Sequence, residues 1–310
     1  DLKKVLPQVR IWMGGPEASY DAVHLMDELP EVELIMQGEG EETFTRLVEA
    51  CECGTEVCFS ELPGIVLRRS DGTIEVHRPA PLMNLDDIPF SYGDLSGLEH
   101  RIIYYESSRG CPFSCSYCLS SIDKKVRFRS LSLVTRELQF FLDRKVPQVK
   151  FVDRTFNCKK SHSMAIWQYL LEHDNGITNF HFEISSDLLD DDELALMKQM
   201  RPGLIQLEIG VQTTNLMVVK EIRRTMDLDK VARRVAQVNT FGNIHQHLDL
   251  IAGLPYEDIE SFHRSFNDVY KMEPEQLQLG FLKVLKGSYM EEMKQKYGLL
   301  SQSKPPYEVL

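Results

Sequence analysis

The sequence has no apolar run close to the roughly 18 to 20 residues needed to span a bilayer. Its first residues also lack the basic-then-apolar order of a signal peptide. Positive charge is scarce, because 35 Lys and Arg stand against 47 Asp and Glu and give a net charge of −12. This balance argues against broad, sequence-independent binding to nucleic acid, which depends on clustered Lys and Arg. We therefore expect a cytoplasmic protein that does not act at a membrane.

The seven cysteines lack the even number and the even spread of a disulfide framework. They are clustered, and in a chain of 310 residues with no secretion signal such clusters indicate metal binding or catalysis. Predicted elements are interrupted at both termini, so we expect a fragment of a longer protein.

Residues 1–55 predict part of a parallel-sheet domain. Short apolar runs at 8–13 and 32–37 are typical of buried strands, and helical patterns follow at 20–29 and up to Ala50. This β-α-β-α order is characteristic of α/β domains.

Residues 56–100 are less regular, and we interpret them as a linker. They contain a predicted hairpin at 64–78 that turns at Asp71-Gly72, followed by a segment with several prolines.

From residue 101 onward, strand and helix patterns alternate steadily. Six strands are predicted, at 102–107, 149–153, 179–185, 204–212, 245–253 and 275–284. Helical stretches lie between them, at about 131–145, 161–173, 190–200, 216–240 (broken near Asp227) and 257–272. We expect an α/β fold, a partial (β/α)6 TIM-like barrel over 101–290, with 291–310 beginning a C-terminal extension. In such barrels the chemistry lies at the carboxyl ends of the strands.

The predicted barrel interior is polar. Because side chains alternate along a strand, Glu183 shares a face with His181 and Ser185. The same count gives two further polar faces, one of Gln206, Glu208, Gly210 and Gln212 and one of His245, His247 and Asp249. Structural barrels usually fill this space with branched aliphatic residues. The pattern indicates either a bound polar ligand or buried networks of satisfied hydrogen bonds.

Three cysteines, Cys111, Cys115 and Cys118, fall in the loop after the first barrel strand with the spacing C-x3-C-x2-C. Three thiolates suit zinc or an iron–sulfur cluster. A structural zinc site usually has a fourth Cys or His in a paired pattern, and the next cysteine here is Cys158. Chance spacing and zinc remain the alternatives to a cluster that leaves one iron open.

The segment CPFSCSYC resembles the signature of the radical SAM superfamily. The resemblance implies that Cys111, Cys115 and Cys118 hold a 4Fe-4S cluster whose fourth iron binds S-adenosylmethionine. Reduction of the cluster then cleaves that cofactor to methionine and a 5′-deoxyadenosyl radical, which abstracts hydrogen from the substrate.

Other segments resemble family motifs at the expected strands, over about 190 residues in the family's order. FVDRTFN stands at the second-strand motif and implies that Asp153 contacts the methionyl group of the cofactor. Glu183 stands where related barrels carry a carboxylate facing the cofactor, and Tyr117 is implied to lie beside the adenine.

IGVQT and LDLIAGLPYE resemble two further family motifs and imply that Gln212 and Asp249 contact the ribose. The departures are small: Thr213 replaces the usual Ser, and Tyr256 replaces a common Gly.

MGGPEASY and ELIMQGEGEETF resemble the last part of a cobalamin-binding domain of the kind that precedes some radical SAM barrels. The resemblance implies that the turns at Gly14, Gly15 and Gly38 approach the nucleotide tail of cobalamin. The alternative is two ordinary tight turns. The whole arrangement resembles bacterial radical SAM proteins that bind cobalamin and continue into an uncharacterised C-terminal domain.

Four further cysteines carry weaker signals. Cys51, Cys53 and Cys58 are either an auxiliary metal site or incidental thiols, and Cys158 is either a methyl carrier or uninvolved. His245 and His247 are candidates for acid–base or substrate contacts, or for a buried network.

We expect an enzyme, and the resemblance implies cobalamin-dependent methyl transfer to an unactivated carbon. The first alternative is a radical rearrangement, cyclisation or methylthiolation without that transfer. The second is an iron–sulfur or metal-binding protein without turnover, which would have no use for ribose contacts. An electron donor such as flavodoxin or ferredoxin is implied, and the substrate is not identified by the sequence.

Overall fold

The computed structural model describes residues 1–52, residue 59 and residues 62–310. It divides the chain into two compact units, Asp1–Ile88 and Pro89–Leu310, which are considered separately below. The sequence led us to expect boundaries after residues 55 and 100. The structure instead includes the hairpin in the first unit and residues 89–100 in the second.

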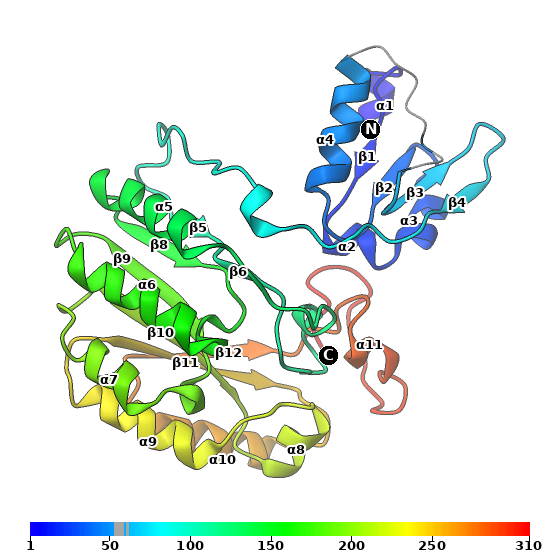
Figure 1. The fold of residues 1–310 in the computed structure, drawn as a ribbon. Coiled ribbons are helices and arrows are strands. Elements are labelled where there is room, and N and C mark those ends of the chain that lie inside the picture. Colours follow the sequence, from blue (N-terminus) through cyan, green and yellow to red (C-terminus); the bar gives the residue numbers. More distant parts are fainter. Residues whose placement is uncertain (53–58, 60–61) are drawn as a thin grey trace. The chain divides into compact units, whose positions relative to one another are not determined.

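The first unit contains a four-stranded sheet in the order β1-β2-β3-β4 (Figure 1). Its strands are Trp12–Met13 (β1), Leu34–Met36 (β2), Ile65–Arg68 (β3) and Ile74–Val76 (β4). β1 and β2 are parallel, whereas β3 and β4 form an antiparallel hairpin that pairs with β2. The hairpin turns at Asp71-Gly72 as predicted, with a φ of +87° at Gly72.

Helices cover both faces of this sheet. They are α2 (Pro16–Ser19), α3 (Ala22–Glu28) and α4 (Glu41–Glu52), whereas α1 (Leu2–Val5) buries no residue. Ile35 of β2 packs with Met26 of α3 on one face, whereas its neighbour Leu34 packs with Leu47 of α4 on the other. The alternation along β2 thus places apolar side chains on both sides, as expected for a strand covered by two helical layers.

The second unit contains a six-stranded parallel sheet in the order β12-β11-β10-β9-β8-β5. The strands are Ile103–Tyr105 (β5), Gln148–Phe151 (β8), Asn179–Ile184 (β9), Ile205–Gln212 (β10), His245–Ala252 (β11) and Gln276–Phe281 (β12). They are the six strands predicted from the sequence. β5 and β12 are the two edges of the sheet, so the barrel is partial, as predicted.

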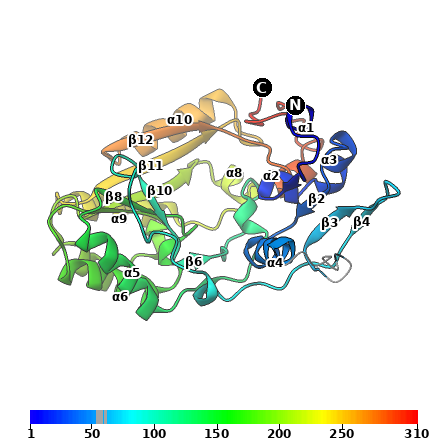
Figure 2. The ribbon, with the colours of Figure 1, turned by 90° about the horizontal axis from the view of Figure 1, so that it is seen from above.

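Five helices lie along the outer side of this sheet (Figures 1 and 2): α5 (Leu131–Asp143), α6 (Lys160–Glu172), α7 (Asp191–Met197), α9 (Leu228–Asn239) and α10 (Ile259–Tyr270). The short helix α8 (Leu216–Glu221) instead packs with Leu254 and Met290. The predicted break near Asp227 has a local cause, because the Asp227 side chain accepts a hydrogen bond from the Lys230 N–H and caps α9. Asp190 and Asp258 cap α7 and α10 in the same way.

The core of the second unit lies between the sheet and these helices. In β10 the residues Ile205, Leu207, Ile209 and Val211 are buried, and they alternate with half-buried polar or glycine positions. The apolar side chains pack outward under the helices, which leaves the polar series to face the barrel interior.

Shorter elements complete the second unit. β6 (Ser108–Arg109) and β7 (Arg127–Phe128) form a two-stranded ribbon, and α11 (Tyr289–Glu292) follows β12. Single turns of 3-10 helix also occur, at Leu85–Asp87 in the first unit and at Leu119–Ser121, Phe156–Cys158 and Ser186–Leu188 in the second. In the described part of the chain, no helix is long and apolar enough to cross a membrane.

Candidate functional site

A cavity of about 170 Å³ lies at the carboxyl ends of the barrel strands, where the sequence predicts the chemistry. The loop after β5 contributes one part of its wall, including Cys111, Cys115, Tyr117 and Cys118. The strand ends and the segments after them contribute the rest, including Arg154, Thr155, Glu183, Ser185, Glu208, Gly210, Gln212, Arg224 and Asp249. One cavity therefore brings together every residue predicted to hold the cluster or S-adenosylmethionine except Asp153.

The ribbon of β6 and β7 forms the stem of the cysteine loop, and Ser108 pairs with Phe128 in its register. The loop begins at Gly110, whose φ is +94°. A Cβ atom at Gly110 would stand 2.8 Å from the backbone oxygen of Lys125, so a larger residue requires the loop to open. The Cys111 N–H donates to the Asp123 carbonyl at 3.2 Å and closes the stem.

The three cysteines differ in exposure. Cys111 and Cys115 are buried, whereas Cys118 is half-buried. Burial raises the pKa of Cys111, because a thiolate there loses hydration. The Cys118 N–H donates to the Cys115 carbonyl at 3.2 Å, so these two residues are joined by a tight turn.

The donor set fits an iron–sulfur cluster by its chemistry. Thiolates are soft ligands, and all three thiols border the same cavity. Across the residues that the structure describes, no three Cys, His, Asp or Glu side chains are drawn together as in a formed metal centre. The cluster assignment therefore rests on ligand type, spacing and the shared cavity.

Gln212 stands at an irregular point of β10. The register with β11 shifts between Gly210 and Gln212, and Gln212 has a φ of +73°, which is costly for a residue other than glycine. Its Oε1 atom is buried and has no hydrogen-bond partner among the described residues. Buried acceptors are rarely left unpaired, so this oxygen suits a hydroxyl donor from a ligand in the cavity.

Gly210 lies beside this side chain and matches it in shape. A Cβ atom at Gly210 would overlap the Gln212 amide nitrogen and would stand 3.5 Å from Nη2 of Arg224. The Gly210 carbonyl also accepts a hydrogen bond from Arg224 Nη2. Glycine at this position therefore lets two functional side chains lie against the strand.

Arg224 is a site residue that sequence reasoning missed. Its Nη1 atom donates to Tyr117 Oη at 3.1 Å and lies 3.7 Å from Cys115 Sγ. Its Nε atom is buried without a hydrogen-bond partner among the described residues. A half-buried guanidinium with a buried, unused Nε donor suits an anionic ligand group. The one available signal was the basic pair Arg223-Arg224, which interrupts the helical pattern before Asp227.

Asp153 lies behind the cavity wall. Its side chain is fully buried and accepts hydrogen bonds from the Ser107 N–H, the Ser107 hydroxyl and the Ser108 hydroxyl at 2.9, 2.6 and 2.6 Å. Burial raises the pKa of Asp153 to about 6, although these hydrogen bonds oppose the shift. The structure thus attaches Asp153 to the strand that enters the cysteine loop, and the adjacent Arg154 and Thr155 border the cavity instead.

A charged network forms the interior side of the cavity. Lys150 Nζ lies 2.8 Å from Glu208 Oε2, and His181 Nε2 lies 2.8 Å from the same oxygen. The interaction with His181 first, and then that with Lys150, lowers the pKa of Glu208 to about 2. His181 and Glu208 belong to two of the predicted polar faces, and Lys150, which the sequence did not single out, joins them in this network.

Glu183 and Asp249 are less fully engaged than Glu208. Glu183 Oε1 lies 3.7 Å from Lys150 Nζ, and burial followed by the charge of Glu208 raises the pKa of Glu183. Asp249 Oδ1 lies 3.1 Å from His247 Nε2, and this interaction raises the pKa of His247. Both carboxylates border the cavity and can accept hydrogen bonds from a ligand.

The two described cysteines outside the cluster motif, Cys158 and Cys51, differ in burial. Cys158 is half-buried, is not part of the cavity wall, and has a pKa raised to about 11 by burial. Cys51 is exposed at the end of α4. Cys53 and Cys58 lie outside the described residues, so the alternative of a second metal site remains a prediction.

Two of the three glycines predicted to contact cobalamin have room around them. Gly15 and Gly38 have φ values of +85° and +75°, and a Cβ atom at either would meet no other atom within 4 Å. At Gly14 a Cβ atom would approach Met36 Cε to 3.3 Å. The positive φ values explain glycine at two of the three predicted cobalamin contacts, whether or not a ligand approaches them.

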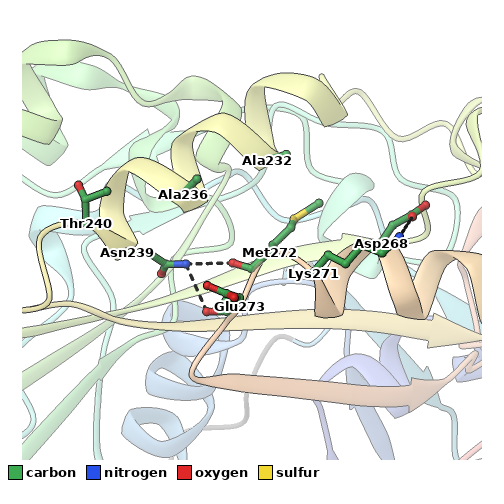
Figure 3. Close-up of a pocket in the computed structure, with 8 residues that line it drawn as sticks. All are labelled: Ala232, Ala236, Asn239, Thr240, Asp268, Lys271, Met272 and Glu273. Carbon is green, nitrogen blue, oxygen red and sulfur yellow. Dashed lines mark hydrogen bonds and ion pairs between the residues drawn. The ribbon is translucent and has the colours of Figure 1, made fainter.

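A larger cavity, of about 560 Å³, lies between α9 and α10 (Figure 3). Its wall consists of residues from these two helices and the turns that follow them, where Asn239 donates to the carbonyls of Met272 and Glu273. It is lined by no residue from a strand end or from the cysteine loop. Although this cavity is larger, we do not take it as the candidate functional site, because the three cysteines and the polar side chains around them line the smaller cavity.

Comparisons with known proteins agree with the site. Residues 105–269, just over half of the chain, match the radical SAM superfamily. An uncharacterized methyltransferase of Pyrococcus horikoshii is 26% identical over 285 residues, covering 87% of this chain and 60% of that protein. The cobalamin-dependent radical SAM methyltransferase TokK of Streptomyces tokunonensis is 26% identical over 281 residues, covering 84% of this chain and 40% of that protein.

Among solved structures, the radical S-adenosylmethionine methyltransferase TsrM from Kitasatospora setae, with cobalamin and a 4Fe-4S cluster bound, superposes with a TM-score of 0.79. The superposition covers 97% of this chain and 61% of that chain at 15% identity, which shows a shared fold. The chain spans 60% and 40% of the two curated relatives.

Proposed function

The chain belongs to the radical SAM superfamily, and we propose on this basis that the protein is a cobalamin-dependent radical SAM methyltransferase acting on an unactivated carbon. One observation carries the proposal. A single cavity joins three cysteines with the signature spacing to Gln212 and Asp249, whose oxygens can accept hydrogen bonds from a ribose.

In this proposal, Cys111, Cys115 and Cys118 hold a 4Fe-4S cluster. When bound, the cluster and S-adenosylmethionine supply one-electron chemistry that removes hydrogen from a substrate. The stem of β6 and β7 fixes the loop that carries the thiolates, and burial of Cys111 limits the access of water to them. An electron donor such as flavodoxin or ferredoxin delivers the reducing electron.

The side chains around the cluster loop complement the charges of the groups of S-adenosylmethionine. Arg224 offers its guanidinium to the carboxylate, and Glu183 faces the ammonium group. Gln212 Oε1 and Asp249 accept from the ribose hydroxyls, while Tyr117 borders the adenine. Asp153 acts indirectly, because it holds Ser107 and Ser108 at the entry to the loop.

Cobalamin binding is proposed for the first unit, through the turns at Gly14, Gly15 and Gly38. Two features support it: the parallel strands β1 and β2 with open glycine turns, and the likeness to TokK and TsrM. The methyl group would pass from cobalamin to the substrate carbon, and the substrate itself is not identified.

Anaerobic purification of the protein, followed by reconstitution with iron and sulfide, tests the proposal. We expect absorbance and mass spectrometry to show bound cobalamin, and the reduced protein to convert S-adenosylmethionine to 5′-deoxyadenosine and S-adenosylhomocysteine. Matched reactions without reductant should form neither product. Because Cys51 is exposed and does not line the cavity, Cys51→Ala should behave as the wild type.

The outcomes separate the alternatives. Formation of 5′-deoxyadenosine by protein that retains no cobalamin would favour a rearrangement, cyclisation or methylthiolation. Cluster-loaded protein that leaves S-adenosylmethionine intact under reduction would contradict an enzymatic role altogether.

A further inference from the structure

Ser116 lies at the centre of the cysteine loop, between Cys115 and Tyr117, and its side chain is fully buried. Its backbone is held from two sides. The Ser116 N–H donates to the Ile222 carbonyl at 2.9 Å, and the Ser116 carbonyl accepts from the Met290 N–H at 2.8 Å. The middle of the loop is therefore fixed to the end of α8 and to α11, rather than to its own stem.

The Met290 N–H is available for this bond because of where it lies in α11. Ser288 caps the helix by accepting from the Glu291 N–H, and Met290 is the second helical residue. The first N–H groups of a helix have no partner within it, so a donor at this position can serve another segment. The Met290 side chain is fully buried against Val218 and Ile222 of the α8 region.

The C-terminal segment, residues 285–310, is also anchored beyond α11. The Val284 N–H donates to the Tyr307 carbonyl and the Val309 N–H donates to the Leu282 carbonyl, both at 2.9 Å. This antiparallel pairing attaches the end of the segment to the residues that follow β12. Contacts on both sides of the Met290 bond thus restrict the movement of α11 away from the cysteine loop.

These contacts hold three consecutive residues of the loop, Cys115, Ser116 and Tyr117. Arg224, two residues after Ile222, approaches Cys115 Sγ and donates to Tyr117 Oη, while Ile222 and Met290 hold the backbone of the residue between them. Precise placement of ligands depends on such supporting bonds, because a loop alone has many accessible conformations.

We propose that the C-terminal segment is a positioning element of the cluster site, in which the Met290 N–H holds the Ser116 carbonyl and thereby sets the geometry of Cys115 and Cys118. Met290 lies outside residues 105–269, so this support comes from beyond the part of the chain that matches the superfamily. The proposal rests on the proposed function, since it assigns Met290 a role at a cluster.

The variant Met290→Pro tests the bond directly. It removes the N–H, and proline is tolerated in the first turn of a helix. Met290→Ala is the matched control, because it shortens the same buried side chain but keeps the N–H. Tyr289→Pro is the second control, because it places proline one residue earlier and leaves the Met290 N–H in place.

Two kinds of measurement follow. In cluster-free protein, we expect Met290→Pro to raise hydrogen exchange at the Ser116 amide about two- to tenfold above Met290→Ala, as expected for the loss of one hydrogen bond. In reconstituted protein, we expect a chelator to remove iron faster by a similar factor. We also expect the electron paramagnetic resonance spectrum of the reduced cluster, and its change on adding S-adenosylmethionine, to differ from those of both controls.

Hydrogen exchange of the wild-type protein tests the proposal even where Met290→Pro does not fold. If the bond to the Ser116 carbonyl forms, the Met290 amide must be protected from exchange. An unprotected Met290 amide, or a Met290→Pro protein that matches Met290→Ala in every readout, overturns the proposal. Failure of the proposed function looks different: wild-type protein would hold no cluster or leave S-adenosylmethionine intact, while the exchange result on cluster-free protein would stand.

Discussion

The two units of the chain bury different kinds of side chain. In Asp1–Ile88, Thr43 is the single buried polar residue within the described part of the unit, and the rest of the core is apolar. In Pro89–Leu310, charged and titratable groups such as Asp153, His181 and His247 are buried as well. Buried charge is costly unless it is paired or serves a ligand, so its uneven distribution separates the roles of the units. The second unit provides polar and charged side chains for chemistry. The groups that the first unit could present to a ligand are chiefly the backbone atoms of its turns.

The largest effect is expected where a reactive side chain is removed from the second unit. Cys115→Ala should abolish binding of the cluster and reduce cleavage of S-adenosylmethionine below detection, because three thiolates are the fewest that can hold a cluster with one open iron. Iron content and 5′-deoxyadenosine formation measure this loss. Cobalamin binding by the first unit should persist, and a variant that kept its cluster and its activity would refute the central assignment.

Arg224→Gln should have the next largest effect. It removes a positive charge beside Cys115 Sγ and a donor to Tyr117 Oη. We expect the affinity for S-adenosylmethionine to fall about tenfold or more, the usual consequence of losing a hydrogen bond to a charged group. The midpoint potential of the cluster should become more negative, because a nearby cation favours the added electron.

Equilibrium binding and redox titration provide the two readouts for Arg224→Gln. Arg46→Gln, on the surface of α4, is the matched control and should change neither. An unchanged potential together with unchanged affinity would remove Arg224 from the site.

Much of this second unit is predictable from sequence, because local patterns determine it. The alternation in β10 identified the inward polar series, and the Asp227 cap explains the predicted break between α8 and α9. The cysteine spacing located the loop, and alternation placed Glu183 and Asp249 at the cavity.

The rest depends on contacts between distant residues, which no local pattern carries. Arg224 reaches Cys115 across 109 positions, and the Met290 N–H reaches the carbonyl of Ser116. The pairing of the β3–β4 hairpin with β2 is of the same kind, since a hairpin alone does not indicate which sheet it joins. Asp153 shows the limit of a motif, because the motif implies a contact with the cofactor, whereas the side chain accepts hydrogen bonds from Ser107 and Ser108.

A pH-dependent effect should follow from Asp153, the buried carboxyl of the second unit. Its pKa is raised from 3.8 to about 6, so the folded protein binds this proton more tightly than the unfolded chain does. The resulting stabilisation is complete below about pH 4 and is lost as the pH rises through about 6. A shift of roughly two units corresponds to about 3 kcal/mol of unfolding free energy.

Denaturant unfolding between pH 4 and 7, followed in the second unit, measures this dependence. Asp153→Asn cannot ionise, so the difference between wild type and variant should vary over this range by about that amount. A difference that stays constant with pH would show that Asp153 does not titrate in this window.

The smallest effects are expected at the glycine turns of the first unit. Substitutions there test whether a ligand contacts the backbone of these turns. Gly38 and Gly72 have φ values of +75° and +87°, and a Cβ atom at either would meet no other atom within 4 Å. Alanine at each position should therefore cost a similar backbone strain of about 1 kcal/mol. Only Gly38 lies in a turn proposed to approach cobalamin, so Gly38→Ala should weaken cobalamin binding well beyond its effect on stability, while Gly72→Ala should not. If both variants bind cobalamin as the wild type does, the open space at Gly38 serves the turn alone, and the cobalamin contacts must come from other residues.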